Sequence, residues 1–557
     1  MFRRNSKLFL FGFRFVFCFK IFQFYAPGAC FMKKYEYEIG GERSNGQRKI
    51  IESLLPESYR SFPKGQVPAS EEICLERIFG WENGIKSKGM SRCFSSDSIC
   101  RRGRNNRIRF GQTISLILAV FCCGCISISG AGEINVTDYP SIHEAISANP
   151  GRVLYVPCGD YVIDRKISLR NDNSGLIGSG RIIQNNPGEP IIEIENVENV
   201  TLRDLTLTRS EGKTETGREA VLAIRCEELK IENLRVLDNR TRSAAVSLRD
   251  CNGARIQNCL VRNYMKIDVD DRTNSPNYGY AFYCIDGTGI SVRGSTGTVI
   301  RGNRVIERNL LPTPEIKECY KLGTFSKKNA EKGKIISPKT WDEEYVNNWH
   351  QGSAIIVTSP ETSDRTLIVE NVIENAAQGI DLHCDHVVVA NNIVSNSFMG
   401  MKAMHGSKNV LIVGNQFIKN DLWSIGLMPG ASSHDATQDE KTGKPVPANC
   451  DGGSIIANNI ISDFGYGDSH WIWGDNGIPI KFDFGQLPHN PPLRDVVVTG
   501  NIVYDTGRES GATATPPRYR YAVGVPQGEK GPKNIRFSGN LFHSGTAGIS
   551  NVEIAPD

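Results

Sequence analysis

Aromatic residues are scarce in this 557-residue chain, at 8% of positions, and ten of the 24 phenylalanines lie between Phe2 and Phe31. The rest of the sequence therefore has few large side chains with which to build a thick hydrophobic core. Glycine, in contrast, is abundant at 55 residues. Many glycines and few aromatics are typical of a chain with short elements and many turns.

The sequence also lacks the cysteine spacing of a metal site. Of the 16 cysteines, eight lie at or before Cys125 and eight follow it, and the later group contains no Cys-x-x-Cys pair and no zinc-type cysteine–histidine spacing. Cys226 and Cys251 follow Arg225 and Arg249 in what we interpret as adjacent repeats. They are expected either to form a disulfide after export or, as we favour, to stack as small apolar residues.

The larger part of the chain lacks a net positive charge. Residues 1–131 contain 21 Lys and Arg against 10 Asp and Glu, a net +11, whereas residues 132–557 contain 44 against 51, a net −7. Nucleic-acid-binding domains usually present a strongly basic surface. The acidic balance of the larger part therefore gives no reason to expect a nucleic-acid partner.

The first 109 residues lack the sustained periodicity of a folded domain. Their phenylalanine-rich run, FLFGFRFVFCFKIFQF, is interrupted by Arg14 and Lys20, which makes it a poor membrane span. We expect residues 1–109 to be unstructured, or to be an over-extended reading frame whose true start lies near Met90.

Residues 110–131 carry the pattern of an export signal. Five arginines in RRGRNNRIRF precede the apolar run TISLILAVFCCGCISIS, and the small residues Ser129 and Ala131 follow. We expect this segment to export the protein to the periplasm, the cell surface or the medium. The alternative is a single membrane anchor at about residues 113–128.

Short strand-like units recur from about residue 132 to the end of the chain, for example HVVVANNIV, VLIVGNQFI and DVVVTGNIV. Apolar residues alternate within each unit, which is the period of a strand, and a 20–25-residue repeat is typical of a solenoid. Asparagines that we expect to stack inside one turn as a structural ladder are separated by 68, 21, 23, 44, 42 and 39 residues: Asn303, Asn371, Asn392, Asn415, Asn459, Asn501 and Asn540. The longer separations are either single turns of the solenoid with inserted loops or two turns each.

A short helix is predicted at the start of the solenoid, in YPSIHEAISANPG. Ser141 and Glu144 have the spacing of a capping box, and Ile142, Ala145 and Ile146 share one face. The segment RVLYVPCGDYVI that follows predicts a strand, a turn and a second strand. A helix in this place would cover the open edge of the first turn of the solenoid.

The stretch from Gly379 to Asn415 contains two near-copies of one unit, GIDLHCDHVVVANNIV and GMKAMHGSKNVLIVGNQF. Aligning their first glycines places Lys402 beside Asp381. In a strand whose apolar residues face inward, Asp381 and His383 face outward, and outward side chains of adjacent rungs lie about 4.8 Å apart. We therefore predict a solvent-facing patch that consists of Asp381, His383, Lys402 and His405.

Two segments carry a resemblance to known families. The opening SIHEAI…GRVLYVPCGDYVI resembles the start of pectate-lyase-superfamily chains, which implies an all-β fold, a single-stranded right-handed parallel β-helix (a pectin-lyase-like solenoid), over residues 132–557 with the short helix as its N-terminal cap. Residues 379–385, GIDLHCD, are similar to the G-F-D-P-H-D stretch of alginate C5-epimerases. In that family the histidine is implied to be the base and a basic residue on the next rung the acid. This chain has Leu382 in the proline position and an additional Cys384, and Lys402 and His405 stand where an arginine is expected.

Abstraction of the C5 proton of a uronate requires a base, a group that neutralises the carboxylate, and an acid. The ordinary pKa of histidine suits His383 to the role of base. Lys402 can neutralise or protonate, and Asp381 can orient His383 or pair with Lys402. The alternative interpretation is an ordinary cross-rung ion pair between Asp381 and Lys402, beside a surface histidine.

Further candidates lie outside this patch. Arginines expected to share the outward column of His383, and either to bind an acidic polysaccharide or to form a solvated face, are Arg225, Arg249 and Arg293. Trp423, like Trp349, Trp471 and Trp473, is placed in or beside a loop, where an indole can stack on a sugar ring or pack in the loop. The segment KIDVDD, residues 266–271, is a candidate Ca²⁺ loop or a simple turn, and no other metal or cofactor is expected.

Loops at 307–352, 430–450, 463–490 and 505–530 are expected to build the walls of a groove. Together these features predict an exported carbohydrate-active enzyme that acts on an acidic polysaccharide by C5-proton abstraction, as a lyase or an epimerase. A non-catalytic glycan-binding or envelope scaffold is the first alternative. A glycoside hydrolase is the second, although hydrolysis requires two carboxylates at a defined separation and no second acid is placed beside Asp381.

Overall fold

The computed structural model describes residues 16–25, 29–38, 134–359, 361–439, 441–467, 476–504 and 517–554. The chain divides into two compact units, residues 1–117 and 118–557. In the first, β1 (Val16–Tyr25) and β2 (Ala29–Glu38) pair as an antiparallel hairpin. The predicted export signal or anchor at 110–131 lies outside the described residues. No helix in the described ranges is both long and apolar enough to cross a membrane.

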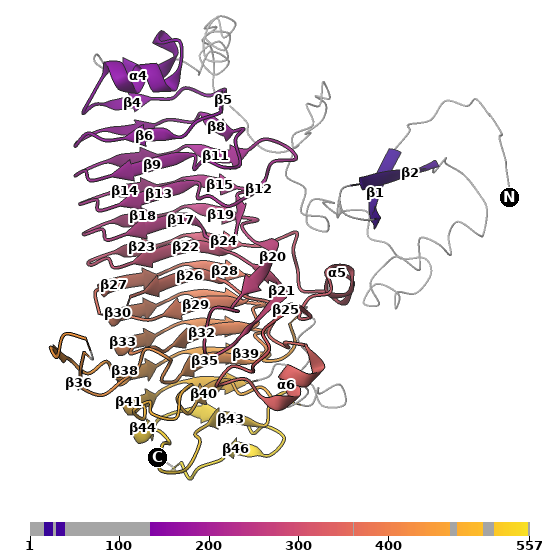
Figure 1. The fold of residues 1–557 in the computed structure, drawn as a ribbon, viewed down its shortest axis with the longest axis vertical. Helices are drawn as coiled ribbons and strands as arrows, with labels where there is room; N and C mark the ends of the chain where they lie inside the picture. Colours follow the sequence, from indigo (N-terminus) through magenta and orange to yellow (C-terminus); the bar gives the residue numbers. More distant parts are fainter. Residues whose placement is uncertain are drawn as a thin grey trace, which may run out of the picture. The chain divides into compact units, whose positions relative to one another are not determined.

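Residues 134–554 form a coil of stacked rungs, each of which contributes one short strand to each of three parallel sheets in turn (Figure 1). We call them sheets 1, 2 and 3, in the order in which the chain passes through them. Strands of one sheet pair only with the strands of the rungs before and after, in register, as in Asp381 with Lys402. The predicted solenoid is therefore present.

The strands of the three sheets follow the rungs from the N-terminal to the C-terminal end. Sheet 1 contains β3 (Ile134–Asn135), β4 (Val153–Tyr155), β7 (Gly175–Ile177), β10 (Thr201–Arg203), β14 (Lys230–Glu232), β18 (Arg255–Gln257), β23 (Val299–Arg301), β27 (Asp364–Val369), β30 (Asp385–Ala390), β33 (Lys408–Val413), β38 (Gly452–Ala457), β41 (Arg494–Thr499) and β44 (Lys533–Ser538). Sheet 2 contains β5 (Asp160–Ile163), β8 (Arg181–Gln184), β11 (Thr206–Arg209), β15 (Arg235–Leu237), β19 (Leu260–Arg262), β24 (Arg304–Ile306), β28 (Val372–Glu374), β31 (Ile393–Ser395), β34 (Gln416–Ile418), β39 (Ile460–Ser462), β42 (Ile502–Tyr504) and β45 (Leu541–Phe542). Sheet 3 contains β6 (Ile167–Leu169), β9 (Ile192–Glu195), β13 (Val221–Ile224), β17 (Ala244–Arg249), β22 (Thr288–Arg293), β26 (Ser353–Thr358), β29 (Gln378–Leu382), β32 (Met399–Ala403), β35 (Trp423–Leu427), β40 (Ile480–Phe482), β43 (Tyr521–Gly524) and β46 (Gly548–Ser550).

The core is a continuous column of aliphatic side chains inside the coil. In β30, Val387 and Val389 point inward and are buried, whereas Val388 between them faces out and is half-buried. The β-branched residues that the strands favour thus fill the coil, rung upon rung. This explains how a chain with few aromatics builds a core: no rung has to span a thick layer.

The asparagine ladder lies at the corner between sheets 1 and 2. Asn392, for example, is fully buried, accepts from Asn371 Nδ2 at 2.9 Å, and donates its own Nδ2 to Asn415 Oδ1 at 2.9 Å. The same contacts link all seven predicted positions from Asn303 to Asn540. Val299 pairs directly with Leu367, so the 68-residue separation is one rung with an insertion. The predicted ladder is confirmed, and the long separations are inserted loops.

The first rung is capped as predicted. The helix α4 (Ile142–Ala148) begins after Ser141, whose Oγ accepts the Glu144 N–H at 3.2 Å. It follows a short 3₁₀ helix, η2 (Val136–Asp138), and buries Ile142 and Ala145 against the core. In Figure 1, α4 lies across the end of the stack beside β4. The capping helix therefore covers the apolar end that the first rung would otherwise expose.

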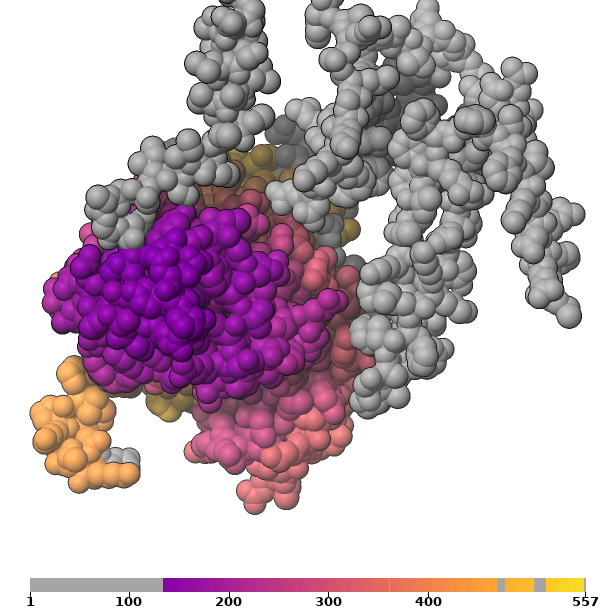
Figure 2. Space-filling view, turned by 90° about the horizontal axis from the view of Figure 1, so that it is seen from above, coloured from indigo at the N-terminus to yellow at the C-terminus, as the bar shows by residue number. Residues whose placement is uncertain are grey.

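Insertions leave the coil at both edges of sheet 3. Between sheets 2 and 3 they carry β12 (Glu215–Thr216), β16 (Arg240–Thr241), β20 (Lys266–Asp271), β21 (Tyr280–Asp286), α5 (Pro314–Tyr320), β25 (Phe325–Lys328) and α6 (Pro338–Glu343). Between sheets 3 and 1, the insertion at residues 428–451 carries β36 (Thr437–Gln438) and β37 (Pro445–Val446). Figure 2 shows the insertion at 428–451 in orange and the insertions between sheets 2 and 3 in pink, and both project beyond the first rungs. The outer surface of sheet 3 between these insertions is called the sheet 3 face below.

Candidate functional site

The register of sheet 3 aligns outward side chains of successive rungs in two columns on the sheet 3 face. One column contains Ile356, Asp381, Lys402, Gly426 and Lys481. The other contains Arg249, Arg293 and Thr358, and it continues to His383, whose Nδ1 lies 3.1 Å from Thr358 Oγ1. Charged and hydroxyl groups from three rungs therefore meet around β26, β29 and β32.

Asp381, on β29, is the centre of this cluster. Its Oδ1 lies 2.9 Å from His383 Nε2, and its Oδ2 lies 3.4 Å from Lys402 Nζ. The contact with His383 lacks the alignment of a hydrogen bond, so we treat it as an ion-pair contact. The ring of His405 lies edge-to-face on that of His383, with centroids 4.5 Å apart. The structure thus brings together all four residues of the predicted patch.

The cluster is not the solvent-facing patch that strand alternation predicted. Ile380 and Leu382 do point inward, but Asp381 is itself only 4% exposed, and the side chains of His383 and Lys402 are 14% and 16% exposed. The reason is the close spacing of rungs, about 4.8 Å, which lets longer neighbours fold over a short carboxylate. The solvent-facing part of the prediction is wrong for Asp381.

The charges around Asp381 keep its carboxylate ionised. Burial raises the pKa of Asp381, but the positive charges of His383 and Lys402 outweigh burial and hold the pKa of Asp381 below its usual value. An ionised carboxylate beside Nε2 keeps a proton on that nitrogen. Nδ1 of His383 is then the acceptor for the Thr358 hydroxyl, and it is the basic nitrogen of the ring.

His405 follows β32 and is held by the insertion at 428–451. Its Nδ1 accepts the Ser432 N–H at 3.3 Å, so the ring proton is on Nε2. Burial, together with the nearby charges of His383 and Lys402, lowers the pKa of His405 to about 3. A Cβ added to Gly430 would lie 2.2 Å from His405 Nδ1, so only glycine leaves room for the ring. His405 is therefore neutral and oriented.

Asp451 anchors the same insertion to the coil. It is buried, and its carboxylate accepts the N–H groups of Gly406 and Ser407, both at 3.0 Å, and the hydroxyl of Ser433 at 2.5 Å. Asn449 Nδ2 adds a bond to the carbonyl of His405 at 2.9 Å. Since Gly406 directly follows His405, these contacts fix the position of the histidine relative to the insertion at 428–451.

Asp451→Asn is expected to stabilise the protein at neutral pH. Burial raises the pKa of Asp451 to about 7, although its hydrogen bonds oppose this. The folded protein therefore keeps a proton that the unfolded chain releases above about pH 4, and stability falls as pH rises from about 4 to 7. The variant has no such pH-dependent decrease. Its unfolding free energy, measured by urea denaturation, should exceed that of the wild type by about 2–4 kcal/mol at pH 8 and equal it at pH 4.

A matched control is Asp435→Asn, which alters an exposed carboxylate of the same insertion. This variant should unfold like the wild type at both pH values. An Asp451→Asn difference that stays constant from pH 4 to pH 8 would contradict the assignment of a buried, proton-retaining carboxyl group.

The predicted arginine column is correct in two of its three members. Arg249 pairs in register with Arg293, and Arg293 with Thr358, but the residue level with Arg249 in the preceding rung is Ile224. Arg225 stands one position later, in a left-handed turn (φ 51°), and its guanidinium contacts Glu195 at 2.6 Å. Arg225 therefore points away from the column, because the strand ends one residue before it.

Trp423 was predicted in or beside a loop, and it is the first residue of a strand. It is in β35, is 8% exposed, and lies against Gly426, whose missing side chain leaves room for the indole. Lys481 Nζ lies 5.3 Å from the centre of the ring. The indole thus packs between Gly426 and Lys481 and does not present a free stacking surface. Trp349 is also buried, and residues 471 and 473 lie outside the described ranges.

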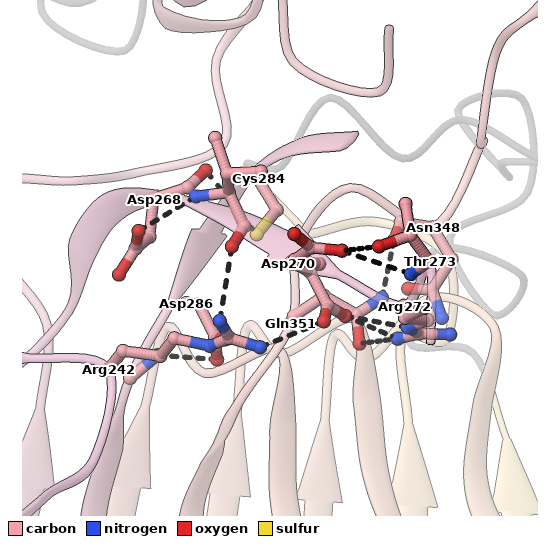
Figure 3. Close-up of polar contacts among 12 residues, drawn as sticks. Arg242, Asp268, Asp270, Arg272, Thr273, Cys284, Asp286, Asn348 and Gln351 are labelled. Carbon is pink, nitrogen blue, oxygen red and sulfur yellow. Dashed lines mark hydrogen bonds and ion pairs between the residues drawn. The ribbon is translucent and has the colours of Figure 1, made fainter. Parts of the chain in front are cut away.

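The candidate Ca²⁺ loop is a strand. Residues 266–271 form β20, which pairs antiparallel with β21, and their carboxylates are engaged by basic side chains (Figure 3). Asp270 lies between Arg242 and Arg272, at 2.9 and 2.6 Å. In the described ranges no group of three or more His, Cys, Asp or Glu side chains is arranged to hold a metal ion. Asp270 and Asp271 are paired with basic side chains, and the segment is a strand, so its prediction as a loop or turn is wrong.

Cys226 and Cys251 are both buried with free thiols in adjacent rungs. They belong to an internal row at the corner between sheets 3 and 1, in which a small side chain of one rung bonds the backbone of the rung before. Ser295 Oγ accepts the Cys251 N–H, and Ser407 Oγ accepts that of Cys384. Stacking, the favoured expectation, is what the structure shows.

Three residues of the site were missed by the sequence analysis: Thr358, Ser432 and Asp451. Thr358 reaches His383 only because an insertion of more than 40 residues returns the chain to the next position of sheet 3. Asp451 did carry a signal, because it occupies the row position where earlier rungs have Ser407 and Cys384. An acidic residue is unusual in a row of small side chains, and an alignment of the rungs would have singled out Asp451.

Comparison with known proteins agrees with this architecture. The family model described as a right handed beta helix region matches residues 219–417. Together with the three parallel sheets of stacked rungs, this match confirms the predicted fold, a right-handed parallel β-helix. No curated protein sequence matches the chain significantly.

Three similar solved structures are the Dettilon tailspike protein, the A-module of a mannuronan C-5 epimerase from Azotobacter vinelandii, and an exopolygalacturonase from Thermotoga maritima. Their identities are 14%, 14% and 9%, and their TM-scores are 0.44, 0.37 and 0.44. The matches cover 73%, 74% and 74% of this chain, and 63%, 100% and 92% of the other chains. This chain thus spans less than two thirds of the tailspike chain.

Proposed function

We propose that this protein is an exported enzyme that abstracts the C5 proton of a uronate unit in an acidic polysaccharide, as a lyase or an epimerase. One observation carries the proposal. His383 is held between the Asp381 carboxylate at Nε2 and the Thr358 hydroxyl at Nδ1, and the ammonium group of Lys402 lies beside them. A base and a neutralising cation therefore share one partly buried surface.

The geometry assigns a role to each group. His383 Nδ1 accepts the C5 proton, and Asp381 stabilises the imidazolium that forms. The electron pair left at C5 is delocalised into the substrate carboxylate, whose growing charge Lys402 neutralises. His405, neutral and with its proton on Nε2, donates a hydrogen bond to a sugar oxygen. Breaking of the C4–O4 bond, with O4 taking the proton from His383, then gives a lyase. Protonation of C5 from the opposite face by water, with His383 returning its proton to solvent, gives an epimerase.

The arginine column supports an anionic substrate. Arg293 is exposed, and within the described residues it has no ion-pair partner, whereas Arg249 pairs with Glu219 at 2.7 Å. Arg293 is one rung from Thr358 and continues the line of the cluster along the coil. A polysaccharide lying along this line would place one carboxylate at Lys402 and a neighbouring one at Arg293.

Incubation of the purified protein with a panel of polyuronates in D₂O tests the proposal. Deuterium incorporation at C5, followed by NMR, detects either reaction, and absorbance of an unsaturated product identifies a lyase. Absence of both signals on every polymer, together with tight binding to one of them, would instead favour a glycan-binding scaffold. That second candidate is favoured by the nearby Asp385–Lys408 pair at 3.6 Å, which shows that such cross-rung pairs also occur outside the site.

Lys402→Met is expected to raise KM for the uronate polymer about 10–100-fold, because a charge-assisted contact with the carboxylate is lost, and also to lower kcat. Steady-state kinetics on the polymer identified by the panel measures both constants. Lys408→Met is the matched control. It removes the cross-rung ion pair between Lys408 and Asp385, which lies on sheet 1 and outside the site. Equal kinetic effects of the two substitutions would exclude a specific role for Lys402.

A further inference from the structure

Thr358, His383 and Asp381 form a hydroxyl–imidazole–carboxylate array. Thr358 Oγ1 lies 3.1 Å from His383 Nδ1, and His383 Nε2 lies 2.9 Å from Asp381 Oδ1. This is the order of contacts by which a base activates a hydroxyl nucleophile while a third group orients the base. In C5-proton abstraction the threonine hydroxyl only orients His383, and no step uses it as a reacting group.

The surroundings of Thr358 hold its hydroxyl in place. Thr358 ends β26 and is half-buried on the sheet 3 face. The next residue, Ser359, has φ 79°, a conformation that residues other than glycine rarely adopt. The buried Ser363 donates its hydroxyl to the Thr358 carbonyl, and its N–H to the Ser359 carbonyl at 2.8 Å. The end of the strand that carries the hydroxyl is thus tied down, as a nucleophile requires.

The electrostatics favour transfer of the hydroxyl proton. Asp381 is ionised, since the charges of His383 and Lys402 outweigh burial in setting its pKa, and it stabilises a positive charge on His383. Arg293 pairs in register with Thr358 on the adjacent strand, about 4.8 Å away along the sheet. It is exposed and without an ion-pair partner among the described residues, so its guanidinium can approach an oxyanion formed at Thr358.

We propose that the protein also hydrolyses carboxylic esters of sugar hydroxyl groups, with Thr358 as the nucleophile. Thr358 Oγ1 attacks the ester carbonyl carbon as its proton passes to His383 Nδ1, and Arg293 faces the oxyanion. Collapse breaks the bond to the sugar oxygen, which takes the proton from His383 and leaves as an alcohol. Water, deprotonated by His383, then hydrolyses the acyl-threonine to a carboxylic acid and regenerates the hydroxyl.

The test uses the full chain with 4-nitrophenyl acetate as the ester probe. Thr358→Val removes the hydroxyl while keeping the shape of the side chain, and it is expected to lower kcat/KM at least about 100-fold. Thr358→Ser should retain hydrolysis to within about tenfold. The matched control is Thr208→Val, the same change at a half-buried outward threonine of β11 on sheet 2, which should hydrolyse like the wild type.

Covalent labelling provides a second measurement. Diisopropyl fluorophosphate should add its phosphoryl group to the peptide that contains Thr358 in the wild type, and to no site in Thr358→Val or His383→Ala. Hydrolysis by Thr358→Val within twofold of the wild type, or labelling only at other residues, overturns the proposal and leaves Thr358 as a group that orients His383. Equal melting temperatures of Thr358→Val and the wild type exclude misfolding as the cause of a loss.

The ester proposal stands apart from the proposed polysaccharide chemistry, and C5 deuterium exchange separates the two. If the wild type exchanges deuterium at C5 but hydrolyses 4-nitrophenyl acetate no faster than Thr358→Val does, only the ester proposal is contradicted. Hydrolysis without exchange on any polyuronate contradicts C5-proton abstraction alone. Both results come from the wild-type protein in the same preparation.

Discussion

Replacing His383 by alanine should lower turnover of the uronate polymer by about 10²–10⁴-fold, the usual contribution of a positioned base. The imidazole of His383 is the base of the proposed reaction. Neither Asp381 nor the neutral His405 can replace it as the acceptor of the C5 proton. Deuterium exchange at C5 measures the loss. Added imidazole should restore part of the rate, because the substitution leaves an imidazole-sized space beside Asp381.

Folding should survive this change, although not without cost. His383 fills no apolar core position, but it neutralises the buried carboxylate of Asp381. Its loss leaves Lys402 as the remaining ion-pair partner, and we expect a decrease of about 1–3 kcal/mol in unfolding free energy. The matched control is His386→Ala, which removes an exposed histidine three residues later that pairs with Asp364 at 3.0 Å. Full activity of His383→Ala on a proven substrate would refute the assignment.

Asp381→Asn should damage both stability and turnover. Removing one charge of a buried pair typically costs about 3–5 kcal/mol, since the partner stays buried without compensation. An amide beside Nε2 can also donate to the ring, which moves the ring proton to Nδ1 and removes the basic nitrogen from the sheet 3 face. We therefore expect a loss of about 10²-fold or more in C5 exchange. Urea unfolding measures the stability.

The double variant Asp381→Asn/Lys402→Met separates the two effects. Removing both charges relieves the uncompensated ammonium group, so stability should recover towards that of the wild type while activity stays low. A double variant as unstable as the single one would show that the carboxylate acts through packing and not through its charge.

The pH dependence of stability provides an independent check on Asp381. Its pKa is lowered in the folded state, although burial opposes the charges of His383 and Lys402. A lowered pKa contributes stability above the usual aspartate value, and this contribution is lost as pH falls through the lower, folded value. The gap in stability between wild type and Asp381→Asn should therefore narrow in acid and stay constant above about pH 5.

Local patterns predicted the repeating architecture well because the forces that build a β-helix act between neighbouring rungs. Each asparagine of the ladder bonds the equivalent asparagine of the next rung, so a fixed position in the repeat becomes a fixed position in space. The same register placed Lys402 beside Asp381, as the alignment of the two copies predicted. The capping helix was equally local, since Ser141 and Glu144 are three residues apart.

Predictions for individual outward residues were less reliable, because a shift of one position changes the direction of a side chain. Arg225 follows the end of its strand and turns away, while Arg249 and Arg293 are the last residues of theirs. The segment 266–271 was interpreted as a loop, but β21, which begins nine residues after it ends, pairs with it as a strand. Neither outcome is visible in the segment itself.

The sequence by itself determined the coil, its ladder and the adjacency of Asp381, His383, Lys402 and His405, because these depend on repeat spacing and strand alternation alone. The tertiary structure decided the chemistry of the cluster: the burial of Asp381, the contact of Thr358 with His383, and the fixed tautomer of His405. Asp381 is buried by the longer side chains of its own and the next rung. The other two features depend on insertions that leave the coil and return, which bring Thr358 to His383 and Ser432 to His405. Local periodicity does not encode where such insertions fold back.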